Sequence, residues 1–419
     1  MKADRMMNTY QTTPQEPRGA SRHAVPGRVW MDFTASWHWG RPPTGITRVE
    51  QECARWLLAA APERVSFCVY DGARHVWCEL PQAAVERVLG GEYGLARTGN
   101  AGNVGALRPV DEAVEFASGE AYVCLNADQT AERLIRMYHA RRRGVRVVGI
   151  AYDIIQILFP HFYWPYADQG CSRYFVDLAW AASHIYCISR RTQEDLLGFY
   201  REVGAPIPPT SLVRLGDTVP QVDGAVSAQV REIIGQPYIL VVGTIEIRKN
   251  HEVLYRALLR LLEQGRELPL LVFAGMRGWR VDDLLQSLEH DVRVRDRIRL
   301  LSHASDADID ALYRHCLFTA FPSHYEGWGL PVAESLAYGK FCVASNGGAI
   351  PEIGGELTEL LSPHDVGAWA EALWRHAVDA DALRERERAI RERYRTTPWE
   401  EAAATMMRPV LDGGLFARE

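Results

Sequence analysis

The stretch "LFTAFPSHYEGWGLPVAESLAYGKFCVASN", residues 317–346, begins and ends with a short apolar run. The two runs, 317–323 and 341–346, do not alternate with polar residues, which is typical of strands covered on both faces. Between them, Pro331 suits the first position of a helix and Gly339 suits its end. The stretch therefore predicts a strand, a loop, a helix and a second strand, which is one unit of a parallel sheet.

Apolar runs alternate with helical segments along the rest of the chain. Such alternation predicts two doubly wound, Rossmann-like α/β domains that face each other across a cleft, with ligands beyond the carboxyl ends of the strands. Besides the runs quoted above, we expect strands at 238–243, 268–275, 298–302 and 358–362 in the second half, and at 28–34, 65–70, 121–126, 145–153 and 184–189 in the first.

The chain of 419 residues is about twice the usual domain length. We place an N-terminal domain at 28–220 and a C-terminal domain at 221–397, because the polar stretch 215–229 has the composition of a linker. Residues 1–27 are polar, and we expect them to be disordered. Residues 398–419 predict an amphipathic helix, which either packs back across the first domain or caps the second.

Composition narrows the function before any motif is considered. The formal net charge is -6, which argues against nucleic acid as a partner, because polyphosphate binding favours a basic face. Eight cysteines are scattered without a CxxC pair, as in a cytosolic protein with buried reduced thiols. No apolar run predicts a signal peptide or a spanning helix, so we expect a cytoplasmic protein.

Two carboxylates, Glu326 and Glu334, flank the turn inside the quoted stretch. We expect Glu326 in the loop, Glu334 on the first helical turn, and free backbone N–H groups at residues 330–332 between them. A helix start suits a phosphate, and carboxylates accept hydrogen bonds from sugar hydroxyls, so the pair favours a nucleotide sugar. The alternative is that Glu334 only complements the helix dipole and Glu326 is solvated.

A second loop, "GTIEIRKNH", follows the strand at 238–243. Gly243 permits a turn, and Arg248 and Lys249 place two cations just before a helix that we expect to begin after an Asn250 cap. At the carboxyl end of a strand, these cations could neutralise a diphosphate leaving group; a solvated surface pair is the alternative.

A third loop, "NGGAIPEIGG", follows the strand at 341–346. Its Gly347 and Gly348 would permit close approach of the backbone to a ligand, and Glu352 follows them. A plain turn is the alternative.

Together these three loops resemble those of the retaining glycosyltransferases of the GT-B fold, in the family that includes bacterial mannosyltransferases and relatives of sucrose and glycogen synthases. The likeness extends over residues 238–365. It implies that Arg248 and Lys249 contact the donor diphosphate, that Glu326 lies near the donor sugar, and that Glu334 binds the ribose.

The first half resembles the same family through "TGITRV" (44–49), "AYDIIQILFP" and "IYCISRRTQEDL". "TGITRV" is similar to the glycine loop near the donor phosphates. The residues that the resemblance implies for donor binding are Gly45, Gly243, Arg248, Lys249, Glu326, Gly329, Leu330, Pro331 and Glu334.

One position departs from the family pattern. Many relatives carry His-Asp where this chain has Tyr152 and Asp153, and that histidine is held to contact the donor sugar. Asp153 then either orients the acceptor, as a fourth catalytic candidate beside Glu326, Arg248 and Lys249, or caps the following segment. His161 and His38 are nearby candidates, for which a structural or surface role is the alternative.

The resemblance implies a retaining transfer of a hexose, with mannose favoured, from a nucleoside-diphosphate sugar to a saccharide or lipid-linked saccharide in bacterial surface polysaccharide synthesis. No cofactor and no metal are expected, since the family needs no acidic metal motif. The aromatic stretches 35–43 and 159–170 suit either saccharide stacking or core packing. The basic segment 133–148 is either solvated or holds the enzyme against the inner face of the cell membrane.

Two other functions remain open at this point. One is a GT-B protein without activity that binds a nucleotide sugar as a sensor or partner subunit, which Tyr152 favours. The other is a synthase that uses a sugar phosphate or a soluble acceptor.

Overall fold

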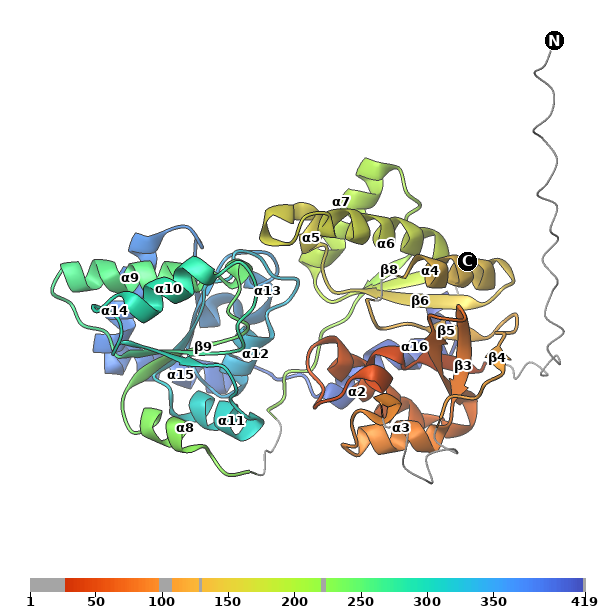
Figure 1. The fold of residues 1–419 in the computed structure, drawn as a ribbon, viewed down its shortest axis with the longest axis horizontal. Helices are drawn as coiled ribbons and strands as arrows, with labels where there is room; N and C mark the ends of the chain where they lie inside the picture. Colours follow the sequence, from red (N-terminus) through yellow and green to blue (C-terminus); the bar gives the residue numbers. More distant parts are fainter. Residues whose placement is uncertain (1–26, 98–107, 128–129, 220–223, 417–419) are drawn as a thin grey trace, which may run out of the picture.

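The computed structural model describes residues 27–97, 108–127, 130–219 and 224–416. Two sheets lie side by side, each with helices on both faces (Figure 1). The predicted disordered segment at 1–27 and the predicted boundary between residues 220 and 221 fall outside the described residues, apart from Gly27. The predicted fold class, two doubly wound α/β domains, is confirmed.

The first sheet has the order β4-β3-β2-β1-β5-β6-β7-β8. The pairs β2–β3 and β3–β4 are antiparallel and the others are parallel. Every strand predicted here is present, and the structure adds β3, β4 and β8. The strands are β1 (Val29–Asp32), β2 (Val65–Asp71), β3 (Val76–Leu80), β4 (Ala113–Val114), β5 (Ala121–Val123), β6 (Arg146–Ala151), β7 (His184–Cys187) and β8 (Thr210–Leu212).

The second sheet is parallel throughout, with the order β11-β10-β9-β12-β13-β14. Its central strands are buried along nearly their whole length, which explains their unbroken apolar sequences. The strands are β9 (Tyr238–Val242), β10 (Leu270–Ala274), β11 (Ile298–Leu301), β12 (Phe318–Phe321), β13 (Cys342–Ser345) and β14 (Thr358–Leu361).

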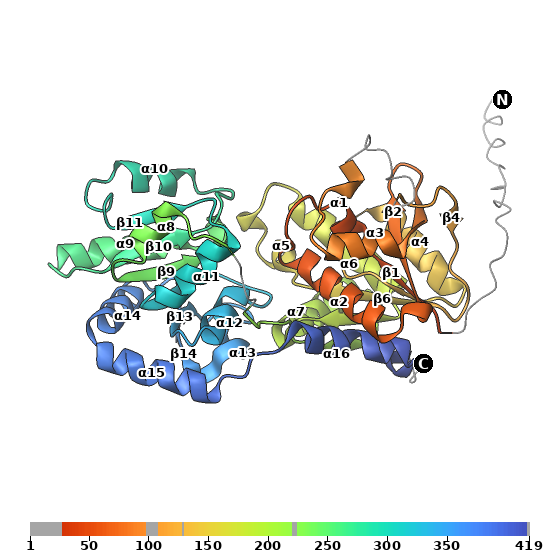
Figure 2. The same cartoon turned by 90° about the horizontal axis from the view of Figure 1, so that it is seen from below.

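Helices cover both faces of each sheet (Figures 1 and 2). Those of the first half are α1 (Thr34–His38), α2 (Ile46–Ala60), α3 (Gln82–Leu89), α4 (Ala131–Arg142), α5 (Ile155–Leu158), α6 (Ala167–Ala181) and α7 (Arg190–Val203). Those of the second are α8 (Ala228–Ile233), α9 (His251–Glu263), α10 (Asp282–His290), α11 (Asp306–His315), α12 (Leu330–Ala337), α13 (Pro351–Gly354), α14 (Val366–Val378), α15 (Ala380–Arg393) and α16 (Trp399–Leu411).

The order of the strands in the second sheet brings two loops to the position at which doubly wound sheets bind ligands. The sheet reverses its direction of winding between β9 and β12, and in doubly wound sheets the crevice beyond such a point holds the ligand. The loop with Arg248 and Lys249 follows β9, and the loop with Glu326 follows β12. Both loops therefore start at the same crevice.

The last helix, α16, lies against the first domain beside α2 (Figure 2). The Tyr186 hydroxyl donates to the Met406 carbonyl at 2.6 Å, and Arg64 Nη2 donates to the Leu411 carbonyl at 2.6 Å. Of the two placements open from the sequence, the helix occupies the one across the first domain. The chain therefore passes between the domains twice, once in each direction.

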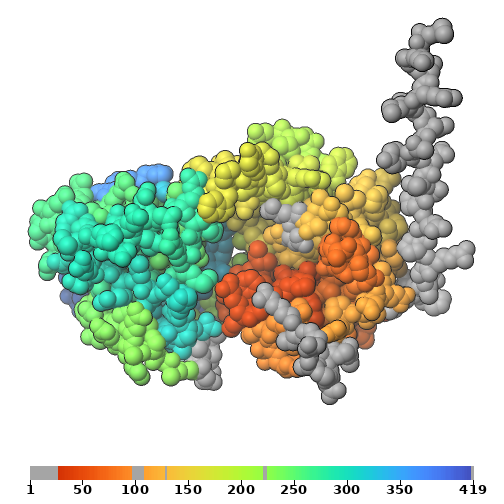
Figure 3. Space-filling view, viewed as in Figure 1, coloured from red at the N-terminus to blue at the C-terminus, as the bar shows by residue number. Residues whose placement is uncertain are grey.

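The domains also touch through the segment after α5. Trp279 Nε1 donates to the Phe162 carbonyl at 2.8 Å, and the Arg280 guanidinium donates to the carbonyls of His161 and Tyr163. In Figure 3 this yellow segment reaches the second domain, and the surface is hollowed below it. The two domains thus face each other across a cleft that is bridged at one side.

Two local predictions were wrong. Glu334 is not in the first turn of α12, because the helix begins one residue before Pro331 and Glu334 is its fifth residue. Asn250 does precede α9, but its side chain does not cap the helix. It adopts a left-handed conformation, with φ of 55°, and its amide donates to the carbonyls of Pro322 and Pro363, which ties together the loops after β12 and β14.

Candidate active site

Arg248 and Lys249 converge on Glu326 where the loops after β9 and β12 meet. Arg248 Nη1 lies 2.7 Å from Glu326 Oε2, and Lys249 Nζ lies 2.6 Å from Glu326 Oε1. The side chain of Arg248 is only 13% exposed, that of Lys249 15% and that of Glu326 9%. Three residues predicted from two separate motifs therefore form one partly buried cluster of charges.

The two cations determine the protonation state of Glu326. Burial opposes ionisation, but attraction to Arg248 and Lys249 outweighs it and lowers the pKa of Glu326 to about 2. Burial in turn lowers the pKa of Lys249, against the attraction of Glu326. A carboxyl with this pKa is a carboxylate at neutral pH, so Glu326 is able to accept hydrogen bonds but not to donate a proton.

Glu246 belongs to the same cluster, although the sequence did not single it out. Its Oε1 accepts from Arg248 Nη2 at 2.7 Å, and its side chain is 2% exposed. Burial raises its pKa against the attraction of Arg248. The residue lies within "GTIEIRKNH", but a single glutamate in a loop carries no signal of this contact. Arg248 is thus held between two carboxylates.

Asp153 is brought to this cluster by close contact between the domains. Gly327 packs so tightly that a Cβ there would lie 2.1 Å from the Tyr152 carbonyl and 2.7 Å from the Asp153 Cβ. Thr192 Oγ1 is within 3.2 Å of the carbonyls of both Tyr152 and Gly327. Burial raises the pKa of Asp153, and attraction to Arg248 opposes the increase.

The Asp153 side chain has a local partner, since its Oδ1 accepts from the Ile155 backbone at 3.0 Å. This contact closes a turn just before α5, whose N-cap residue, Ile154, makes no side-chain cap. The neighbouring Tyr152 hydroxyl donates to the Leu125 carbonyl at 2.8 Å. The tyrosine therefore bonds to its own domain at the position where many relatives carry histidine. His38 and His161 are both exposed.

At Gly347 and Gly348, the space into which a Cβ would point is filled by the loop after β12. A Cβ at Gly347 would lie 2.2 Å from the His324 carbonyl, and one at Gly348 would lie 2.2 Å from the Glu326 carbonyl. The Ala349 backbone N–H also donates to the Glu326 carbonyl, at 2.9 Å. These glycines instead let the loop after β13 pack against the Glu326 loop and hold it in place.

The start of α12 lies beside the same loop. Gly329, with φ of 127°, precedes Leu330 and Pro331, the first two helical residues. Gly243 likewise has a positive φ, of 143°, and it turns the chain after β9. Apart from Glu334, the predicted donor-binding residues of the second domain therefore lie on the loops after β9 and β12 and at the start of α12.

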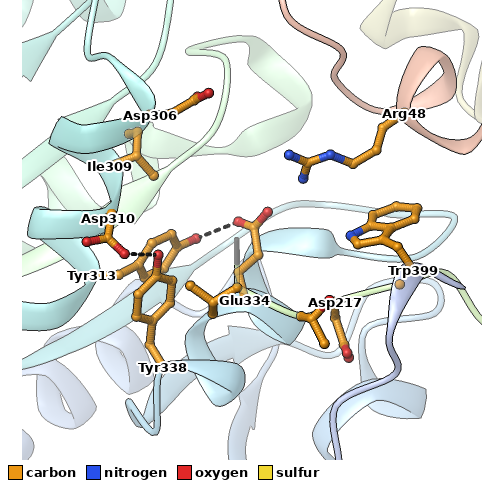
Figure 4. A pocket seen from close by; sticks show the side chains of 12 residues that line it. Arg48, Asp217, Asp306, Ile309, Asp310, Tyr313, Glu334, Tyr338 and Trp399 are labelled. Carbon is orange, nitrogen blue, oxygen red and sulfur yellow. Dashed lines mark hydrogen bonds between the residues drawn. The ribbon is translucent and has the colours of Figure 1, made fainter. Parts of the chain in front are cut away.

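Glu334 faces a separate pocket between the domains (Figure 4). Its Oε2 accepts from the Tyr313 hydroxyl at 2.9 Å. Burial raises the pKa of Glu334, while the hydrogen bond from Tyr313 and the positive charge of Arg48 oppose the increase. The pocket is lined by Arg48, Gly216, Asp217, Thr218, Val219, Asp306, Ile309, Asp310, Tyr313, Glu334, Tyr338 and Trp399.

Gly45 precedes α2 with φ of 50°, and a Cβ there would meet no atom within 4 Å. It therefore lies in open space, one turn before Arg48 of the pocket.

Within the ranges that the structure describes, no three Asp, Glu, His or Cys side chains gather in a way that could hold a metal ion. In the same ranges, no helix is both long and apolar enough to cross a membrane.

Solved structures share this two-domain arrangement. The sucrose-phosphate synthase of Thermosynechococcus elongatus matches with a TM-score of 0.63 at 17% identity, covering 94% of this chain and 100% of that chain. The Anabaena protein HepE, solved in complex with UDP and glucose, matches with a TM-score of 0.58 at 14% identity, covering 91% and 99%. At these identities the likeness defines the fold, and the chain has the GT-B fold.

The sequence assigns the second domain to a family. Residues 226–395 match the family described as glycosyl transferases group 1, and this part of the chain belongs to it.

Two curated relatives each match about half of the chain. The O-antigen chain mannosyltransferase B of Escherichia coli is 31% identical over 190 residues, which is 45% of this chain and 50% of the relative. A D-inositol 3-phosphate glycosyltransferase of Xylanimonas cellulosilytica is 32% identical over 246 residues, covering 54% and 56%. The chain thus spans about half the length of these relatives.

Proposed function

We propose that this protein is a retaining glycosyltransferase. It would move a hexose, with mannose favoured, from a nucleoside-diphosphate sugar to a saccharide or lipid-linked saccharide acceptor in bacterial surface polysaccharide synthesis. The observation that carries the proposal is the cluster of Arg248, Lys249 and Glu326 at the crevice between β9 and β12. The glycosyl transferases group 1 domain and the mannosyltransferase relative support it.

In the proposed reaction, the bond between the sugar's anomeric carbon and the diphosphate breaks, and the acceptor oxygen bonds to the same face of that carbon. The acceptor proton passes to an oxygen of the departing diphosphate, so no strong protein base is needed. Arg248, Lys249 and the start of α12 stabilise the negative charge that grows on the diphosphate. One such well-placed donor contributes about 3 kcal/mol to the transition state.

In this proposal, Glu326 and Glu334 bind two different parts of the donor, its sugar and its ribose. Glu326, ionised by its two cations, accepts hydrogen bonds from hydroxyls of the donor sugar. Glu334 accepts them from the ribose in the pocket of Figure 4. Asp153 faces the reacting centre from the N-terminal domain, where the acceptor would bind. Gly45 would contribute its backbone N–H group to the donor phosphates.

We further propose that the N-terminal domain contacts an anionic membrane where a lipid-linked acceptor resides. Ile135 on α4 and Trp180 on α6 are 50% and 49% exposed and line one surface hollow. Arg142 and Arg143 at the end of α4 are exposed. Apolar side chains beside arginines suit the surface of an anionic bilayer.

Co-sedimentation with liposomes that contain anionic lipid tests this contact. We expect binding that falls as salt rises and that the double variant Ile135→Ser, Trp180→Ser weakens. Val292→Ser, which changes a side chain 77% exposed in the other domain, is the matched control. Binding that is unaffected by the double variant would reject the surface.

A panel of labelled nucleotide sugars, incubated with the purified protein with and without EDTA, tests the proposed function. We expect slow hydrolysis or transfer of one of them, unchanged by EDTA because no metal takes part. Transfer only to a sugar phosphate or other soluble acceptor would support the synthase alternative. Binding without turnover would favour the sensor or partner subunit, which the inward hydrogen bond of Tyr152 supports.

A further inference from the structure

Arg48 projects into the Glu334 pocket from the N-terminal domain (Figure 4). It lies in the first turn of α2, three residues after Gly45. Its side chain is partly buried, and it makes no hydrogen bond or ion pair within the described part of the chain. A partly buried guanidinium usually finds such a partner, so the position is suited to a ligand.

The Trp399 ring supports this guanidinium. The Arg48 Cζ lies 5.5 Å from the ring centroid, which is a cation–π distance. Trp399 is the first residue of α16, and it packs so closely on the linker that a Cβ at Gly216 would lie 2.3 Å from the ring. Because α16 packs back on the first domain, its first residue, Trp399, holds the Arg48 side chain in position within the cleft.

The other charged residues that line the pocket are all acidic, which limits what Arg48 could bind. Asp217 already accepts from Arg214 and Tyr394, and Asp310 accepts from Arg314 and Tyr338. Glu334 faces Arg48 across open space in Figure 4, with no direct bond between them. A ligand between the two must offer hydroxyl donors to Glu334 and a negative charge to Arg48.

We propose that Arg48 binds the phosphate next to the ribose of the nucleotide, so that the donor site includes both domains and the first residue of α16. This inference rests on the proposed function, since it takes the ribose to lie at Glu334. A ribose that carries its 5′-phosphate matches the required pattern of hydroxyls and charge. We take Lys249, in contrast, to contact the terminal phosphate, because it bonds to Glu326, which the proposed function assigns to the donor sugar.

Calorimetry with two pairs of ligands, GDP with GMP and UDP with UMP, separates these roles. For the pair that the wild-type protein binds, we expect Arg48→Gln to weaken diphosphate and monophosphate by a similar factor, about 10-fold to 100-fold. Lys249→Ala should weaken the diphosphate much more than the monophosphate. Arg48→Lys should retain part of the affinity, because it keeps the charge but loses the planar group.

Arg55→Gln is the matched control, because Arg55 lies on the same helix and pairs with Glu52. It should leave both affinities unchanged. Trp399→Leu should weaken monophosphate binding and Trp399→Phe should restore most of it, as a supporting ring requires. Monophosphate affinity that is unchanged in Arg48→Gln would overturn the inference while leaving the proposed function intact. If the wild-type protein binds none of the four nucleotides, the proposed function fails and this inference fails with it.

Discussion

Among single residues, the cations of the candidate active site, Arg248 and Lys249, are each paired with a carboxylate. Arg248 lies between Glu246 and Glu326, and Lys249 shares Glu326 with it. These pairs keep two cations in a partly buried site without an unpaired charge, which would be costly there. In the proposed function, a diphosphate would compete for these cations because it carries more negative charge than one carboxylate.

A second buried acid, Glu50 on α2, gives a prediction about pH. Burial and repulsion by Asp32 raise the pKa of Glu50 to about 8, although the Ser36 backbone donates to its Oε1 at 2.7 Å. The folded state therefore binds a proton that the unfolded state releases above pH about 4.5. Stability should fall as pH rises from about 4.5 to about 8, by at most about 1.4 kcal/mol per pH unit.

Glu50→Gln tests this assignment, because glutamine resembles the protonated acid and keeps an oxygen for Ser36. Urea unfolding from pH 5 to pH 8 should show the variant gaining stability relative to the wild type as pH rises. If the free energies of unfolding of the variant and the wild type changed in parallel with pH over this range, the assignment would be contradicted.

At the scale of helices and strands, the sequence predicted the elements better than their ends. Unbroken apolar runs identified the buried strands, but β3, β4 and β8 were missed. The edge strands β4 and β8 are short, and β3, next to the edge, is interrupted by a glutamate, so none of the three carries a long apolar run. Glycine positions marked the loops, but the sequence could not tell a glycine that meets a ligand from one that meets another loop, as Gly348 does. Arg48 was not recognised because its partner, Trp399, is distant in sequence.

Glu352 shows how elements of the two domains are joined. Its carboxylate accepts from the backbone N–H groups of Arg190 and Arg191, at 2.9 and 2.8 Å, and so caps α7 of the other domain. We expect Glu352→Ala to reduce the free energy of unfolding by about 1 kcal/mol, as other lost caps do, and also to raise KM for the donor. The second effect follows because the cap holds the domains around the cleft.

Asp379→Ala provides the comparison for this variant. Asp379 caps α15 within its own domain, by accepting from the Ala382 backbone at 3.0 Å. Its loss should reduce stability by a similar amount with KM unchanged. Equal effects of the two variants on KM would contradict a role for Glu352 in joining the domains.

At the scale of the whole molecule, α16 joins the end of the chain to the first domain. The sequence predicted this helix but could not choose its place, because an amphipathic face identifies burial and not the surface that covers it. The structure places it against α2, where Met407 is fully buried. The same helix brings Trp399 to the pocket that Glu334 faces, so folding of the C-terminus and formation of this pocket are linked.

Met407→Ala should therefore destabilise the first domain, although the residue comes after the second in sequence. A buried methionine reduced to alanine costs about 2–5 kcal/mol. Calorimetric unfolding should show a lower melting temperature for the first domain, with little effect from Thr405→Ala on the exposed side of the same helix. A change confined to the second domain would contradict this packing.

The most direct test of the whole account is the turnover of Lys249→Ala with the nucleotide sugar that the wild-type protein uses. Loss of a cation that stabilises the departing diphosphate should lower kcat/KM by about 100-fold or more, while the protein remains folded. A variant that transfers sugar as fast as the wild-type protein would show that the cluster at Glu326 is not the catalytic centre.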